Sequence, residues 1–311
     1  MVSIITPAYN CAPYVKEAID SILAQTYQDW EMLIGDDGST DETRHIIDSY
    51  NDPRIKRFHE GQNRGYLWMF NHLLSKSTGD FIMSQDADDI AVLNRIEAQL
   101  RVFDEFPEVG ACGTNCIFFG DFIAERVGNL DAVEGFVSKE YTGLPFAPAT
   151  IMYRRALYEQ VGGFNPYFDR LSSMDQYWVY LMIEKSPVYY LNQVLYKARM
   201  HPTSNHRSVE MSDIKKLASW DVYKLLRMQR KQTGTDSLER GAVAELDQFV
   251  EKLGKNRKWL AEKHREYSAT KADVGDKQNA VTLGIKAVLI WPLASINYRT
   301  LFYVLRKRFL S

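Results

Sequence analysis

The chain of 311 residues is long enough for one large domain or two of ordinary size. Hydrophobic residues make up 45% and charged residues 25%, which is typical of a globular protein and excludes a disordered or fibrous chain. The 38 Lys and Arg nearly balance the 40 Asp and Glu, so the overall charge does not indicate a nucleic-acid-binding protein.

The charges are spread unevenly along the chain. Residues 1–205 contain 17 Lys and Arg against 28 Asp and Glu, whereas residues 252–311 contain 13 against 4. An acidic front followed by a basic tail suggests two parts with different partners. We therefore expect one domain over 1–205 and a second region over 206–311.

The cysteines and the apolar runs indicate a cytoplasmic protein. Three cysteines, at 11, 112 and 116, give no disulfide framework and no zinc-finger spacing. The chain begins with an apolar strand-like stretch rather than with the pattern of a signal peptide. Its longest apolar run, 287–296, is interrupted by Pro292 and is shorter than the about 20 residues that span a bilayer.

Short apolar runs alternate with amphipathic stretches through the first 120 residues. Strands are predicted at 2–6, 31–35, 55–59, 81–84 and 109–119. Helices are predicted between them, at 14–25, after Asp41, at 65–75 and at 93–106. This alternation predicts an α/β fold with a mostly parallel sheet flanked by helices, and such sheets bind ligands at the carboxyl ends of their strands.

The rest of the chain changes character twice. Residues 120–150 are rich in Gly and Pro and predict loops with short strands, before a helix at 172–185 and a strand at 188–196. From about residue 208 we find no strand pattern, and two long polar helices are expected near 209–231 and 237–268. The second region is thus predicted to be a helical C-terminal extension.

Two acidic motifs follow predicted strands directly. Asp37, in the run 36–41 after the second strand, can accept hydrogen bonds from a base or a ribose, although a capped turn with Asp41 as N-cap explains the run equally well. The carboxylates of the run 86–89 repel one another unless a cation lies among them. A hard divalent cation that also binds a diphosphate would explain them, and a solvated acidic loop is the alternative.

Three weaker signals accompany the acidic motifs. Gly65 allows the backbone to approach an anionic ligand at a helix N-terminus, or it simply starts a helix. Asp175, on an aromatic and apolar helix, has the surroundings of a general base, or it is exposed near the start of the helix. His201 can bind a metal or a phosphate and Arg199 can neutralise a phosphate, although a lone His is usually structural.

Taken in order, these motifs resemble those of a family 2 glycosyltransferase with a GT-A fold, over about residues 1–205. The likeness rests on the following segments: Thr6-Pro7-Ala8-Tyr9-Asn10, Asp36-Asp37-Gly38-Ser39-Thr40-Asp41, Asn63-Arg64-Gly65, Gly79-Asp80-Phe81-Ile82, Asp86-Ala87-Asp88-Asp89, Gly162-Gly163-Phe164, Asp175 and Arg199-Met200-His201-Pro202. The resemblance implies that 1–205 is the catalytic domain.

The resemblance also implies a role for each matching residue. Asp175 matches the catalytic base, Asp88 would hold Mn²⁺ or Mg²⁺ on the diphosphate, and His201 matches a position that helps to hold the metal or diphosphate in some members. The residues that would bind the nucleotide sugar are Pro7, Ala8, Tyr9, Asp37, Asn63, Arg64, Gly65, Asp86 and Ala87. Two positions depart from the family pattern, because Met174 precedes the base and Asn165 follows the Gly-Gly-Phe segment.

The implied activity is an inverting transfer of a sugar from a nucleotide-diphosphate donor, typically a UDP-sugar, to a hydroxyl of a saccharide or lipid-linked acceptor. Synthesis of a cell-surface polysaccharide is the expected setting, and no nucleic-acid partner is expected. Two alternatives stay open. One is a phosphatase of the haloacid-dehalogenase type, which the D-x-D of residues 86–88 also resembles, and the other is a non-catalytic protein that binds nucleotide sugars.

The basic tail predicts one further partner. Residues 285–310 combine apolar and aromatic side chains with clustered cations, a composition suited to an interfacial helix on anionic lipid. We expect peripheral contact with the inner face of the cytoplasmic membrane through this tail. The alternative is that the helix packs on the catalytic domain with its cations solvated.

Overall fold

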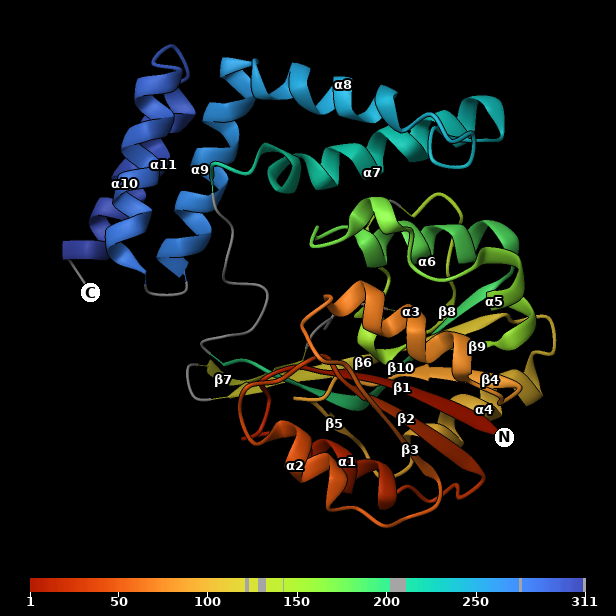
Figure 1. Ribbon diagram of the computed structural model, residues 1–311. Coiled ribbons are helices and arrows are strands. Elements are labelled where there is room, and N and C mark those ends of the chain that lie inside the picture. Colours follow the sequence, from red (N-terminus) through yellow and green to blue (C-terminus); the bar gives the residue numbers. More distant parts are fainter. Residues whose placement is uncertain (121–122, 128–132, 142, 202–210, 274–275, 310–311) are drawn as a thin grey trace. The chain divides into compact units, whose positions relative to one another are not determined.

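The computed structural model describes residues 1–311 except for 121–122, 128–132, 142, 202–210, 274–275 and 310–311. The chain forms two compact units, Met1–Arg207 and Ser208–Ser311. The first unit is an α/β domain built on one sheet, and the second consists of helices in the part that is described (Figure 1). The α/β fold class with a helical C-terminal region is therefore confirmed.

The described strands of the first unit form a single sheet. Their order is β3-β2-β1-β4-β9-β6-β10-β5, with β7 beside β6 and β8 beside β10. The strands are β1 Val2–Ala8, β2 Trp30–Asp36, β3 Ile55–His59, β4 Phe81–Ser84, β5 Ile90–Ala91, β6 Ala111–Gly120, β7 Ile123–Val127, β8 Gly135–Phe136, β9 Met152–Arg154 and β10 Val188–Arg199.

The sheet combines parallel and antiparallel pairs, and β3 is parallel to β2. β1 pairs in parallel with β2 and β4, and β10 pairs in parallel with β6 over most of its length. The antiparallel strands are β5, β7, β8 and β9. Of these, β9 joins the two parallel sets, because it pairs with both β4 and β6. Its three residues are too few to show a recognisable alternation of apolar and polar positions, so the sequence does not predict this strand.

Helices cover both faces of the sheet. In Figure 1, α1 and α2 lie on one side, and α3 and α6 lie on the other. The helical elements of this unit are α1 Val15–Leu23, α2 Thr43–Asp48, α3 Tyr66–Lys76, α4 Arg95–Glu105, the 3₁₀ turn Pro148–Thr150, α5 Arg155–Val161, the 3₁₀ turn Pro166–Phe168 and α6 Met174–Lys185. Side chains of α1 and α4 share a buried apolar cluster with the central strands, which fixes the strand ends that carry the acidic motifs.

An aromatic cluster fastens α3 and α6 to the other face. Trp178 of α6 meets Phe70 of α3 and Phe164 with ring centroids 5.9 and 4.8 Å apart, and its indole N–H donates to the Gly162 carbonyl. Asn71 of α3 binds both backbone polar groups of Phe164. The Gly-Gly-Phe segment therefore joins the two helices whose N-termini carry Tyr66 and Asp175.

The second unit differs from the sequence prediction in two places, of which the first is the region 237–268. Its described helices are α7 Ile214–Thr233, α8 Val243–Gly254, α9 Arg257–Asp273, α10 Lys277–Ile290 and α11 Ser295–Phe309. The single helix predicted over 237–268 is wrong, because the chain ends α8 and restarts as α9. At the break, the Asn256 side chain accepts the N–H of Trp259 and so caps the new helix.

The tail is likewise two helices rather than one. α10 ends before Pro292 and α11 begins at Ser295, so residues 277–309 form a helical hairpin. Among the described residues, no helix combines the length and the hydropathy needed to cross a membrane.

Candidate functional site

Three strand ends bring the acidic motifs to one rim of the sheet. β1 runs parallel to β2 with Ala8 opposite Asp36, and parallel to β4 with Ile5 opposite Ser84. The segments that follow these strands, at 9–10, 37–41 and 85–89, therefore leave the sheet at the same edge. This is the edge at which parallel α/β sheets bind ligands.

Asp37 anchors the loop at 63–65. Its two carboxylate oxygens accept the backbone N–H groups of Arg64 and Gly65 at 2.9 and 2.8 Å, and its own N–H donates to the Ala8 carbonyl. Burial raises the pKa of the Asp37 carboxyl, although both backbone hydrogen bonds lower it. Gly65 has a φ of 97°, which only glycine adopts without strain, so the loop at the start of α3 depends on this residue.

The other residues assigned to the nucleotide sugar differ in exposure. Tyr9, which directly follows β1, is 46% exposed, whereas Pro7 and Ala8 are buried in β1. Asn63 is exposed, and the exposed Arg64 lies over the ring of Trp68 at 4.5 Å. The side chain of Ala87 belongs to the buried core, so only its backbone faces the rim.

The acidic loop at 86–89 contains three carboxylates in different surroundings. Asp86 accepts the Tyr66 hydroxyl at 3.0 Å, while the Asp86 N–H donates to the Tyr196 hydroxyl at 3.2 Å. Burial, and next the negative charge of Asp88, raise the pKa of Asp86 to about 7. Asp89 is 6% exposed, and burial raises its pKa well above the usual range. Asp88 is the one that projects toward solvent, with 31% of its side chain exposed.

Asp88 and His201 lie in contact. The His201 Nε2 and the Asp88 Oδ2 are 2.8 Å apart, although the two residues are separated by 113 positions in the chain. The imidazole ring also packs on Tyr14, with centroids 4.7 Å apart. The structure thus brings together the two residues that the sequence assigned to the metal, in a mostly buried corner that opens at Asp88.

This pair has the chemistry of a divalent-cation site. Carboxylate oxygen and imidazole nitrogen both bind Mn²⁺, and two donors at about 2.2 Å from one ion in a right-angled arrangement are about 3 Å apart. Among the described residues, no group of three or more His, Cys, Asp or Glu side chains is placed to hold a metal. The donor set therefore fits an ion that takes its remaining ligands from diphosphate oxygens and water.

Arg199 contacts the acidic loop through both its backbone and its side chain. Its Nε donates to the Asp88 carbonyl at 2.9 Å, its backbone N–H donates to Asp89 Oδ1 at 2.7 Å, and its terminal nitrogen pairs with Glu17. The guanidinium also lies over the Tyr14 ring at 4.9 Å. These contacts use two of the five N–H donors of the guanidinium, and together with the backbone bond they hold the acidic loop in place.

We expect Arg199→Lys to weaken metal-dependent donor binding about tenfold, because lysine keeps the charge but loses the directed bond to the Asp88 carbonyl. Titration calorimetry with UDP and Mn²⁺ measures this change. The melting temperature should fall by only a few degrees, since the backbone bond to Asp89 remains. Unchanged affinity would show that the loop keeps its shape without Arg199.

Asp175 lies at the start of α6, apart from the acidic loop. Its Oδ1 accepts the Gln176 N–H at 2.9 Å, and burial raises its pKa to about 6. The negative charge of Asp175 also raises the pKa of Asp86, so the two carboxylates are close enough for their charges to interact. A carboxyl with a pKa near neutrality is suited to accept a proton.

Three further residues support the site and have no motif that marks them. Tyr66 and Tyr196 bind the acidic loop through their hydroxyls. Arg95 is fully buried beneath it, and its positive charge lowers the pKa of Asp86. The guanidinium donates to Ser84 O, Gln85 Oε1, Gln99 Oε1 and Ala149 O.

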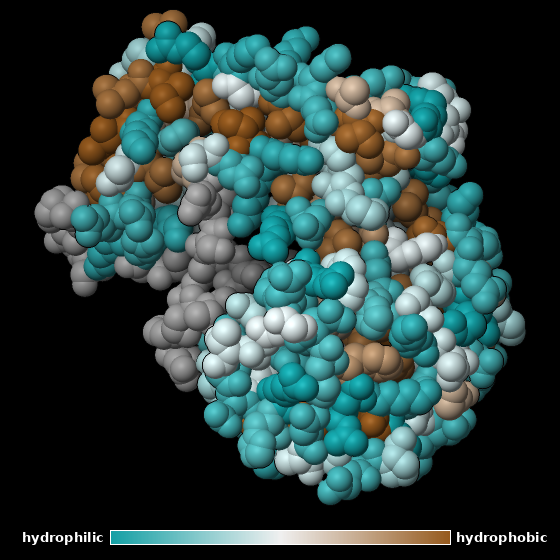
Figure 2. All heavy atoms as spheres, in the orientation of Figure 1, coloured by the Kyte–Doolittle hydropathy of each residue, from teal (hydrophilic) through white to brown (hydrophobic). Residues whose placement is uncertain are grey.

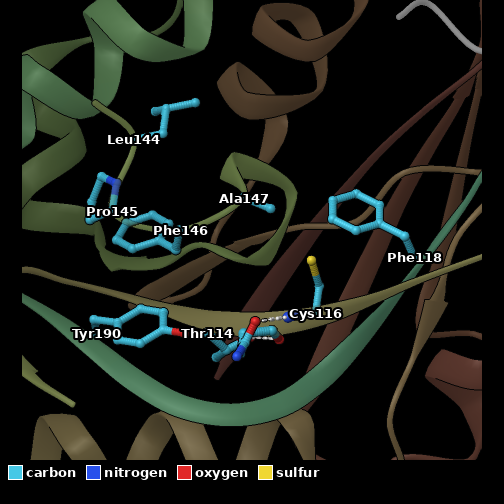
Figure 3. Close-up of a pocket in the computed structure, with 9 residues that line it drawn as sticks. Thr114, Cys116, Phe118, Leu144, Pro145, Phe146, Ala147 and Tyr190 are labelled. Atoms are coloured by element: carbon cyan, nitrogen blue, oxygen red, sulfur yellow. Dashed lines mark hydrogen bonds between the residues drawn. The ribbon is translucent and has the colours of Figure 1, made fainter. Parts of the chain in front are cut away.

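A cavity of about 250 Å³ lies between β6, β10 and the segment before β9 (Figure 3). In Figure 3, Cys116 and Phe118 project from β6 toward the segment that holds Phe146. Its lining residues are Thr114, Asn115, Cys116, Phe118, Leu144, Pro145, Phe146, Ala147 and Tyr190. Cys116 is the register partner of Tyr196, so the strand pair that forms the cavity also supports the acidic loop.

Comparison with known proteins defines the class. The model of the family described as "Glycosyl transferase family 2" matches residues 3–162. EpsE of Bacillus subtilis, whose name describes it as a glycosyltransferase, is 34% identical over 205 residues, covering 64% of this chain and 72% of EpsE. The chain therefore belongs to glycosyltransferase family 2.

Two further kinds of likeness accompany the family match. The UDP-Glc:alpha-D-GlcNAc-diphosphoundecaprenol beta-1,3-glucosyltransferase WfgD of Escherichia coli is 39% identical over 102 residues, covering 33% of this chain and 40% of WfgD. Residues 1–349 of S. aureus TarS with UDP-GlcNAc superpose with a TM-score of 0.61 at 18% identity, covering 99% of this chain and 91% of that TarS segment. The mannosyltransferase PcManGT of Pyrobaculum calidifontis, solved with GDP-Man and Mn²⁺, gives 0.54 at 16% identity, covering 100% and 87%. The structural likenesses show the GT-A fold.

Proposed function

We propose that this chain is a metal-dependent, inverting glycosyltransferase that moves a sugar from a UDP-sugar to a hydroxyl of a saccharide or lipid-linked acceptor. The observation that carries the proposal is the rim of the sheet. There Asp88 and His201 are 2.8 Å apart, and the negative charges of Asp88 and Asp175 both raise the pKa of Asp86. Burial raises the pKa of Asp175 itself to about 6. One group suits a diphosphate-bound cation and the other suits proton transfer.

The donor would lie over the ends of β1 and β2. The exposed Tyr9 ring offers a face for a nucleobase, and the backbone of the loop at 63–65 is held ready by Asp37. UDP as the nucleotide is supported by WfgD and TarS, whose names or solved complexes include UDP-Glc and UDP-GlcNAc. Asp86 would reach the ribose or the sugar from the adjacent strand end.

The metal would be held by Asp88 and His201. Bound there, Mn²⁺ or Mg²⁺ would offset the negative charge that develops on the leaving diphosphate. Arg199 fixes the backbone of Asp88, and Arg95 supplies a positive charge beneath the loop. These two arginines let closely spaced carboxylates remain together before the donor arrives.

Transfer itself needs a base, because a sugar hydroxyl is a weak nucleophile. Asp175 would take the hydroxyl proton as its oxygen attacks the anomeric carbon and the bond to the diphosphate breaks. A single displacement of this kind inverts the anomeric configuration. Inversion is supported by the absence, in the family pattern that the sequence follows, of a second carboxylate assigned as nucleophile.

The two alternatives are separated from this proposal by different evidence. The family assignment excludes a phosphatase of the haloacid-dehalogenase type, and the D-x-D here follows β4 rather than the first strand. A non-catalytic nucleotide-sugar-binding protein would need no proton acceptor beside the donor. Turnover that depends on Asp175 distinguishes the enzyme from such a protein.

The donor and the stereochemistry can be tested together. We expect a panel of UDP-, GDP- and dTDP-sugars to show Mn²⁺-dependent binding and slow hydrolysis for a UDP-sugar only. The product formed from the active α-linked donor should then carry a β-linkage. The one-bond coupling constant between the anomeric carbon and its proton, measured by NMR, distinguishes the two linkages. Retention of the α configuration would overturn the single-displacement mechanism, and preference for a GDP-sugar would overturn the UDP assignment alone.

The setting that we propose is the inner face of the cytoplasmic membrane, in the synthesis of a cell-surface polysaccharide. A lipid-linked acceptor is supported by WfgD, whose name includes a diphosphoundecaprenol acceptor. Peripheral contact through residues 285–310 would bring the catalytic domain to such an acceptor. This part of the proposal concerns location and leaves the chemistry of transfer unchanged.

A further inference from the structure

The α10–α11 hairpin exposes a large apolar surface. Figure 2 shows hydrophobic side chains gathered over these two helices. Leu289 of α10 and Phe302 of α11 are each 70% exposed, and Leu293 in the turn between them is 84% exposed. Ile285, Ile296, Tyr298 and Tyr303 are also exposed. Contiguous apolar surface of this kind marks an interaction site.

The hairpin does not need this surface for its own packing. Its buried contacts come from the opposite side of the helices, where Ala280 and Val281 of α10 meet Val304 of α11 and Ala272 of α9. The turn is fixed by Asn297, whose side-chain amide donates to the Ala287 and Trp291 carbonyls. A hairpin closed in this way can present its outer apolar side without unfolding.

The charge of the hairpin indicates what covers it. Residues 277–311 include six Lys and Arg and no Asp or Glu. Lys286, Arg299 and Arg306 are exposed, and within the described part of the chain they form no ion pair. Lys286 lies next to Ile285, and Arg299 and Arg306 flank Phe302 by one helical turn each. Apolar and cationic side chains thus share one surface.

We infer that the α10–α11 hairpin docks on an anionic lipid bilayer, with Leu289, Leu293 and Phe302 in the acyl boundary and the three cations at the headgroups. A second copy of the chain would bring like charges together, whereas a bilayer rich in acidic lipid complements every exposed charge of the hairpin. The inference deepens the proposed membrane contact by naming its surface, and its purpose rests on the proposed transfer to a lipid-linked acceptor.

The first test is vesicle sedimentation with the chain of residues 1–311. We expect binding to vesicles of 70% phosphatidylcholine and 30% phosphatidylglycerol, and at least tenfold weaker binding to pure phosphatidylcholine. Leu289→Ser with Phe302→Ser should lower the partition coefficient about tenfold or more. Met228→Ser with Val243→Ser is the matched control, because both residues are exposed in the same unit outside the hairpin, at 48% and 40%.

The second test concerns charge. Lys286→Glu with Arg299→Glu should lower binding to acidic vesicles at least 25-fold, from about fivefold for each lost cation. Lys252→Glu with Lys258→Glu, two exposed residues of α8 and α9, makes the same change in net charge and should have a smaller effect. If both double variants lost the same amount of vesicle binding, docking through the hairpin would be overturned.

Two further readouts separate docking from transfer. Leu289→Ser with Phe302→Ser should leave turnover of a soluble acceptor unchanged, whereas failure of turnover in the wild-type protein would count against the proposed function alone. The molar mass measured by light scattering should be the same for this variant as for the wild-type protein. The inference would be refuted if the wild-type chain did not bind acidic vesicles, or if it formed a dimer through the hairpin.

Discussion

Asp175→Asn should abolish sugar transfer while UDP still binds with Mn²⁺. The substitution keeps the size of the side chain and removes its ability to accept a proton, and a positioned base contributes about 10²–10⁴-fold to such a reaction. Asp175 has no contact with Asp88 or His201 among the described hydrogen bonds, so the cation site should be unaffected. Turnover by product analysis and UDP affinity by calorimetry measure the two effects separately.

The same residue predicts how activity depends on pH. The base must be ionised to act, and burial raises the pKa of Asp175 to about 6. The value of kcat/KM at subsaturating acceptor should therefore rise with pH through about 6 and level off above it. Asp104→Asn, on the outer face of α4, is a matched control that should keep the wild-type profile.

Stability should change in the opposite sense to activity. A carboxyl whose pKa is raised in the folded state favours folding while it is protonated, and this contribution is lost as the pH rises through the folded pKa. Above about pH 6, burying the Asp175 charge therefore costs free energy that asparagine does not cost. Asp175→Asn should be more stable than wild type by roughly 1–3 kcal/mol at pH 8, with the difference vanishing near pH 4.

Urea unfolding at pH 8 and pH 4.5 checks this sign. A variant that transfers sugar at the wild-type rate would exclude Asp175 as the base. A variant that is inactive but destabilised at pH 8 would instead show that the carboxylate has a structural role.

The rim of the sheet could be predicted from sequence because its residues follow strands directly. Asp37 and Asp86 come immediately after apolar runs, and the carboxyl ends of parallel strands meet at one edge. The proximity of His201 to Asp88 has no such local basis. It follows from β10, which pairs with β6 and β5 and returns the chain to the acidic loop, and only the resemblance to family 2 enzymes anticipated it.

The supporting residues could not be found from the sequence. Tyr66 and Tyr196 look like core aromatics, and whether their hydroxyls reach Asp86 depends on the register of β10 and the orientation of α3. Arg95 looks like an exposed residue at the start of a helix, yet it is fully buried because its donors are satisfied by two backbone carbonyls and two glutamines. Apolar periodicity carries no information on such polar networks.

The aromatic residues of α6 show the same limit of sequence reasoning. Tyr177 and Trp178 are 3% and 2% exposed and pack against the Gly-Gly-Phe segment and its neighbours. Their helical spacing is equally compatible with a binding surface and with packing. Only the tertiary position of α6 distinguishes the two.

Asp88→Asn should remove metal-dependent donor binding. The carboxylate Oδ2 that lies 2.8 Å from His201 Nε2 is the charged half of the proposed donor pair, and a neutral amide is a far weaker ligand for Mn²⁺. We expect UDP affinity in Mn²⁺ to fall at least 100-fold, to the value that wild type shows in a chelator. Calorimetry of UDP binding with and without Mn²⁺ measures this without any requirement for turnover.

The comparison with His201→Asn makes the assignment sharper. Imidazole supplies one neutral ligand, so its loss should weaken Mn²⁺-dependent binding less than the loss of the Asp88 charge, by about tenfold. Asp104→Asn should leave both values unchanged, because this carboxylate lies on the exposed side of α4. If Asp88→Asn kept the full response to Mn²⁺, the cation would have to be held elsewhere on the rim, and the Asp88–His201 contact would be an ordinary hydrogen bond that closes the end of β10 over the acidic loop.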